Sequence, residues 1–167
     1  MDKTRVLSLF AVLLICVIGV GCTSPQPDGL DAEQEAAIKE TLLSITEAYN
    51  GVWEQLDFEQ IEAYHADDFS YYRRGVVDTT SHDDFEQSFH DNVSTQITAY
   101  WADATDIRVE VLSQNAGVVA FVFRGGVETP DGAKHDYDGA LTYVFKRSGG
   151  EWQIVHIHES AYDPDSP

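Results

Sequence analysis

Residues 150–160 read Gly-Glu-Trp-Gln-Ile-Val-His-Ile-His-Glu-Ser, and they carry the strongest indication of the fold class. Apolar and polar side chains alternate through most of it, which is typical of a β-strand with one buried face. Residues 107–111 also alternate, and residues 118–123 are continuously apolar, as expected of a strand covered on both faces. A Thr-Pro-Asp-Gly turn at residues 129–132 precedes a further strand at residues 137–145. The second half of the chain is therefore predicted to form an antiparallel meander.

The first half of the chain shows helical periodicity instead. Apolar side chains recur every three or four residues through residues 38–56, in one stripe that includes Leu42 and Tyr49. Asp57 is placed to cap a second helix, and Ser81 a third. Helices that precede a run of strands indicate an α+β fold, with one curved antiparallel sheet and three N-terminal helices on its concave side.

The charge balance excludes one large class of partners. The 167 residues include 10 Lys+Arg against 29 Asp+Glu, a formal net charge of -19. A surface this acidic repels phosphate, so we expect no binding to nucleic acid and no charge-driven binding to anionic lipid. The length is that of one domain.

The N-terminal segment resembles a bacterial lipoprotein signal. Lys3 and Arg5 precede an apolar run at residues 7–20, which is shorter than the roughly 20 residues of a membrane-spanning helix. Small residues then stand directly before Cys22. The resemblance implies export, lipidation of Cys22, and anchoring to the cell envelope, at the outer membrane where the cell has one. The alternative is an ordinary secretory signal that contains a cysteine by chance.

This interpretation divides the chain into four parts. Residues 1–21 would be the signal peptide, and residues 22–30 a flexible tether that contains two prolines. Residues 31–162 would form the folded domain, and residues 163–167 a polar tail.

The stretch at residues 150–160 resembles the closing strand of the SnoaL-like branch of the nuclear transport factor 2-like superfamily. It is similar to the pattern Gly-Lys-Trp-Gln-x-Val-His-Phe-His-x-Ser of the association domain of calcium/calmodulin-dependent protein kinase II. The likeness covers residues 33–162 and includes Leu56-Asp57-Phe58, Asp67-Asp68-Phe69 and residues 142–145. It implies a cone-shaped, cystatin-like roll with an open cavity. Isomerases, dehydratases, cyclases and oligomerisation domains share that fold, so the fold alone does not select a function.

Strand parity predicts which residues line such a cavity. Val155 and Ile157 are expected to face inward, whereas Trp152, Ile154 and the two histidines of this strand face outward. The predicted pocket is mostly apolar with a few polar groups, as small-molecule sites usually are. Its lining residues are Tyr49, Trp53, Arg73, Phe85, Phe121, Phe123, Leu141, Tyr143, Val155, Ile157 and Glu159.

Three functions remain open at this point. We expect first the binding of a small, largely apolar molecule. An enzyme of the isomerase, cyclase or hydrolase type is the second, with Tyr49 and Glu159 as candidate catalytic groups. By the resemblance, Tyr49 falls on the tyrosine of ketosteroid isomerases, whereas their base position falls on Arg73. The third is an assembly module with a vestigial cavity.

His156 and His158 face the same side of their strand and could contact a metal ion. Zinc normally requires a third or fourth ligand, and the sequence pattern places no further ligand beside these two histidines. Packing on the convex face of the sheet, at a contact between subunits, is the simpler interpretation. We therefore expect no metal and no cofactor, and a homodimer or higher homo-oligomer.

Overall fold

The computed structural model describes residues 29–73, 76–79, 81–88 and 93–162. The predicted signal peptide, Cys22 and the polar tail lie outside the described residues, as does most of the tether. Leu30, the last residue of that predicted tether, is buried, so it belongs to the folded body. Within the described part of the chain, no helix is long and apolar enough to cross a membrane.

Helix α1 (Ala32–Gln55) begins with a complete capping box. The backbone N–H of Gln34 donates to the Asp31 carboxylate (2.8 Å), and the Gln34 side-chain oxygen accepts from the Asp31 backbone N–H (3.1 Å). The helix ends at Leu56, which adopts a left-handed conformation with φ 53°. The predicted apolar stripe is confirmed, because Leu42 and Tyr49 are fully buried.

Two short helices follow, as expected from their capping residues. Helix α2 (Phe58–Ala63) starts at Asp57, whose carboxylate accepts from the Gln60 backbone N–H (3.1 Å). Helix α3 (His82–Ser88) starts after Ser81, whose hydroxyl oxygen accepts from the Asp84 backbone N–H (3.1 Å). The N-terminal helices of the prediction are therefore present.

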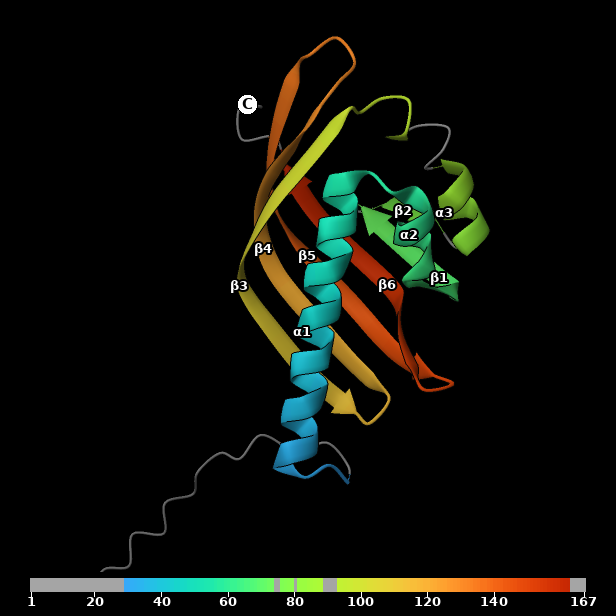
Figure 1. Cartoon of the computed structure of the whole chain (residues 1–167), viewed down its shortest axis with the longest axis vertical. Helices are drawn as coiled ribbons and strands as arrows, with labels where there is room; N and C mark the ends of the chain where they lie inside the picture. Colours follow the sequence, from blue (N-terminus) through green and yellow to red (C-terminus); the bar gives the residue numbers. More distant parts are fainter. Residues whose placement is uncertain (1–28, 74–75, 80, 89–92, 163–167) are drawn as a thin grey trace, which may run out of the picture.

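The sheet has six strands in the order β2-β1-β6-β5-β4-β3. They are β1 (His65–Arg73), β2 (Val76–Thr79), β3 (Ala99–Ser113), β4 (Ala116–Glu128), β5 (Lys134–Ser148) and β6 (Glu151–Tyr162). Figure 1 shows the sheet curving around α1, with α2 and α3 grouped beside β1. The α+β class and the antiparallel meander β3–β6 are confirmed.

One feature of the sheet differs from the prediction, because β1 pairs with β6 in parallel. Strand β6 is the last strand of the meander, and its free edge would otherwise leave backbone N–H and C=O groups unpaired. Strand β1 covers that edge with Tyr71 opposite Ile157 and Arg73 opposite Glu159. The sheet is therefore mixed, and this parallel pair brings together residues that are far apart in the sequence.

A β-bulge in β6 corrects the predicted strand parity. Val144 pairs with His156 and Phe145 pairs with Ile154, so Val155 has no partner across the ladder. Ile154 and Ile157 are consequently both buried, whereas Val155 is partly exposed. The expectation that Ile154 shares the outer face with the histidines is wrong, because the extra residue reverses the alternation.

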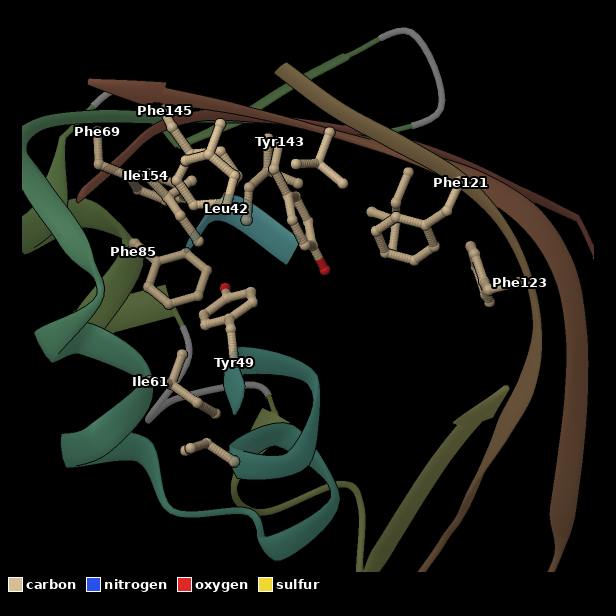
Figure 2. Close-up of a cluster of buried hydrophobic side chains, with 14 residues drawn as sticks. Leu42, Tyr49, Ile61, Phe69, Phe85, Phe121, Phe123, Tyr143, Phe145 and Ile154 are labelled. Atoms are coloured by element: carbon tan, nitrogen blue, oxygen red, sulfur yellow. The ribbon is translucent and has the colours of Figure 1, made fainter. Parts of the chain in front are cut away.

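The core lies between α1 and the concave face of the sheet (Figure 2). Tyr143 extends from β5 toward Tyr49 of α1, and their ring centres are 5.4 Å apart in an edge-to-face arrangement. Helix and sheet approach closely at Gly117, where an added Cβ would lie 2.4 Å from Leu42 Cδ1. Glycine at this position therefore allows α1 to lie against β4.

The outer face of the sheet is less covered than predicted. Phe121 and Phe123 of β4 are buried on the concave side, but Val122 between them is 46% exposed. Val118 and Ala120 are partly exposed on the same side as Val122. The apolar run at residues 118–123 therefore has only one fully buried face in the single chain.

Candidate functional site

A cavity of about 530 Å³ lies on the concave side of the sheet, next to the C-terminal part of α1. Its volume is within the range of about 300–1,000 Å³ that is typical of small-molecule sites. Most of the predicted lining residues border it: Tyr49, Trp53, Arg73, Phe85, Phe123, Leu141, Tyr143, Ile157 and Glu159. The binding role of these residues remains a prediction, but the structure brings them together around one hollow.

Phe121 and Val155 do not border the cavity. The Phe121 ring packs edge-to-face against Tyr143, with ring centres 5.2 Å apart, and belongs to the solid part of the core. Val155 is the extra residue of the β6 bulge, so its side chain does not share the inward face with Ile157. Both errors arise from treating the strands as regular and the cone as hollow along its whole length.

Three further tyrosines line the cavity, namely Tyr71, Tyr100 and Tyr137. Tyr71 stands two residues before Arg73 on β1, so the same parity that selects Arg73 would also have selected Tyr71. Tyr100 and Tyr137 come from β3 and β5 and carry no comparable local signal. Their place at the cavity depends on how far the sheet bends.

Glu159 supplies a carboxylate to the cavity wall. Its side chain is partly buried, and the Tyr71 hydroxyl donates a hydrogen bond to it. The Arg73 guanidinium lies 6.0 Å from the centre of the Tyr71 ring. Burial, followed by the charge of Glu159, raises the pKa of Tyr71 well above its usual value, so the hydroxyl remains a donor at neutral pH.

Tyr49 forms a separate pair with a buried histidine. Its hydroxyl lies 2.8 Å from His65 Nε2, and the His65 ring stacks on Phe69 with 3.9 Å between ring centres. Burial raises the pKa of Tyr49 far above its usual value. The two predicted catalytic candidates therefore border the same cavity but have different partners, His65 for Tyr49 and Tyr71 for Glu159.

Burial also keeps the other cavity tyrosines neutral. The Tyr143 hydroxyl donates to Asn50 Oδ1 (3.0 Å), and burial raises the pKa of Tyr143. The pKa of Tyr100 is likewise raised, first by burial and then by the charge of Glu159. We refer to Tyr49, Tyr71, Tyr100 and Tyr143 as the four shielded tyrosines. Because they remain neutral, they present uncharged rings to any molecule in the cavity.

The two histidines of β6 lie away from the cavity. His156 Nδ1 is 2.9 Å from the Ser70 hydroxyl, and the His156 ring packs edge-to-face against Tyr72. Burial, and then the neighbouring His158, lower the pKa of His156. Among the residues that the structure describes, no three His, Cys, Asp or Glu side chains gather in a way that could hold a metal ion.

Comparison with protein families gives a match over most of the folded body. The model of a SnoaL-like domain matches residues 42–164. No curated protein matches this chain.

Solved structures agree on the fold. A putative scytalone dehydratase from Novosphingobium aromaticivorans has a TM-score of 0.71 at 11% identity, covering 82% of this chain and 94% of that one. The association domain of CaMKII from C. elegans has a TM-score of 0.61 at 19% identity, covering 77% and 98%. An NTF2-like superfamily protein from Salmonella enterica serovar Typhimurium has a TM-score of 0.63 at 15% identity, covering 80% and 94%. At these identities the likeness concerns the fold alone.

Proposed function

Because the chain belongs to the SnoaL-like domain family, a member of the wider NTF2-like fold, we propose that its cavity binds a small, largely apolar molecule. The observation that carries this proposal is the hollow of about 530 Å³ and its wall of aromatic and aliphatic side chains. Such walls favour apolar ligands through the hydrophobic effect, and a few polar groups orient them. A vestigial cavity would instead be filled by side chains.

A neutral apolar dye tests this proposal directly. N-phenyl-1-naphthylamine should bind with one molecule per chain and gain fluorescence in the cavity. Ala161→Trp places a large ring on a cavity-lining residue and should weaken dye binding at least tenfold. Leu112→Trp adds the same ring at an exposed position and is the matched control. Equal dye binding by both variants, each with a wild-type thermal melt, would refute the cavity as the binding site.

A proton-transfer enzyme is the second candidate function. The observation in its favour is the Glu159 carboxylate at the cavity wall, held by the neutral Tyr71 hydroxyl, because this is the arrangement of a positioned base beside a donor. Native mass spectrometry of the purified protein would identify a copurified ligand and the number of subunits together. Incubation of that ligand with the protein in D₂O would separate the candidates. Deuterium uptake that Glu159→Gln abolishes indicates catalysis, whereas an unchanged ligand indicates simple binding.

The location of the protein is also a proposal. The sequence before the folded body supports export and lipid anchoring through Cys22, with the body held close to a membrane surface by a short polar segment. Cys22→Ser should release the protein from the membrane fraction. Membrane association that persists in this variant would contradict the anchor.

Self-association of the domain is proposed through the outer face of the sheet. Val118, Ala120 and Val122 of β4 lie there with Thr142 and Val144 of β5. These side chains carry no charge, although the chain has a formal net charge of -19. Two copies of so acidic a protein repel each other least where their surfaces are uncharged, so this face suits a second copy of the chain.

A further inference from the structure

In the described part of the chain, the cavity wall combines aromatic rings with one carboxylate. Rings from α1, β1, α3, β3, β4 and β5 border the hollow, and the described residues around it include the carboxylate of Glu159. The face of an aromatic ring is electron-rich and attracts cations. A carboxylate among such rings adds a full negative charge to the same space.

Three of the tyrosines in the cavity wall have hydroxyl groups that are already engaged. Tyr71 donates to Glu159, Tyr143 donates to Asn50 (3.0 Å), and the Tyr49 hydroxyl lies 2.8 Å from His65 Nε2. A ligand therefore meets the rings of these tyrosines rather than unsatisfied hydroxyls. This arrangement favours recognition through the charge and shape of the ligand over a dense set of hydrogen bonds.

The negative charge of Glu159 extends through the cavity. It contributes to the raised pKa of each of the four shielded tyrosines. The positive charge of Arg73 opposes this effect at Tyr71, and Arg73 itself is an exposed residue of β1. The formal net charge of -19 also draws cations toward the protein and repels anions.

We propose that the cavity selects an organic cation, a quaternary or protonated amine with an apolar body, over a neutral molecule of the same shape. This inference rests on the proposed function, because it assigns a ligand class to the same cavity. The aromatic rings would surround the cationic group while Glu159 balances its charge. An anionic ligand would instead require Arg73 to dominate the cavity.

Displacement of N-phenyl-1-naphthylamine tests the proposal with matched probes. Benzyltrimethylammonium and neopentylbenzene have nearly the same shape and differ in one positive charge, and phenylacetate supplies the anionic comparison. The wild-type chain should bind the cation at least tenfold more tightly than the neutral molecule, and phenylacetate most weakly. Added salt should reduce the ratio of cation to neutral affinity, because it screens charge, but should not abolish the preference for the cation.

Variants assign the preference to the cavity. Glu159→Gln should reduce the ratio of cation to neutral affinity to below threefold. Glu151→Gln removes the same charge from an exposed position of the same strand and should leave that ratio within twofold of wild type. Arg73→Gln removes a charge that repels the cation and should increase the affinity for the cation by at least twofold.

The outcomes separate the two proposals. If the dye binds but the cation and its neutral isostere compete equally, the cation inference is wrong and the apolar-ligand proposal stands. The cation inference is also wrong if phenylacetate binds more tightly than the cation and the Arg73→Gln variant loses this binding. If neither the dye nor any probe binds, the proposed function itself fails. If Glu151→Gln lowers the ratio as much as Glu159→Gln, the preference reflects the net charge of the protein and not the cavity.

Discussion

Replacing Tyr49 with Phe removes one hydroxyl from the centre of the domain. Tyr49 is fully buried and its hydroxyl lies 2.8 Å from His65 Nε2, while the His65 ring is itself buried. The phenyl ring of the variant retains the edge-to-face contacts with Trp53, Tyr64 and Tyr143. The change therefore isolates the hydrogen bond from the packing of the ring.

The variant should lose about 1–3 kcal/mol of free energy of unfolding, which is the cost of removing the partner of a buried polar atom. This is less than the roughly 3–5 kcal/mol that truncation of a buried aromatic ring to Ala would cost. At roughly 4 °C per kcal/mol for a domain of this size, Tm should fall by about 4–12 °C. Urea unfolding followed by circular dichroism would measure the free energy of unfolding of Tyr49→Phe beside wild type.

Tyr162→Phe is the control, because Tyr162 is 60% exposed and should change stability by less than about 0.5 kcal/mol. If Tyr49→Phe is as stable as this control, the bond between Tyr49 and His65 does not support the fold. A loss as large as that of Tyr49→Ala would mean that the ring, and not the hydroxyl, had been displaced.

The structure makes three further predictions. Gly117→Ala should lower stability by about 1–3 kcal/mol because its Cβ would lie 2.4 Å from Leu42 Cδ1. Gly51→Ala, with no neighbour within 4 Å, should instead stabilise helix α1 by up to about 1 kcal/mol, and thermal melts of the two variants test the difference. The four shielded tyrosines have pKa values above the ordinary 10.0, so the unfolded chain loses these protons at a lower pH than the folded chain and stability should fall as pH rises through about 10. Absorbance at 295 nm should show these four ionising after the other tyrosines of the folded chain. Val122→Lys adds a charge to the outer face of the sheet and should abolish the proposed self-association, so that sedimentation velocity shows monomers, without lowering Tm by more than a few degrees. A variant that associates as strongly as the wild-type chain would contradict the proposed contact.

Elements whose signals are local could be predicted from the amino-acid sequence. Three features depend on spacings of two to four residues, so they can be predicted without the fold: the stripe of α1, the capping residues Asp57 and Ser81, and the alternating strands of the meander. The resemblance of the closing strand to the SnoaL-like domains then indicated the correct family. Strand parity also predicted part of the cavity lining, including Phe123, Leu141 and Tyr143.

The contacts between polar groups in the cavity depend on how distant segments pack together. Tyr71 and Glu159 are 88 positions apart, and they meet because β1 pairs in parallel with β6, which no local pattern specifies. The bulge at Val155 reversed the parity of β6 and placed Ile154 and Ile157 on one face, since a single extra residue moves every later side chain to the other side. Register between distant segments is a property of the packed sheet, and so the partners of Tyr49 and Glu159 could be known only from it.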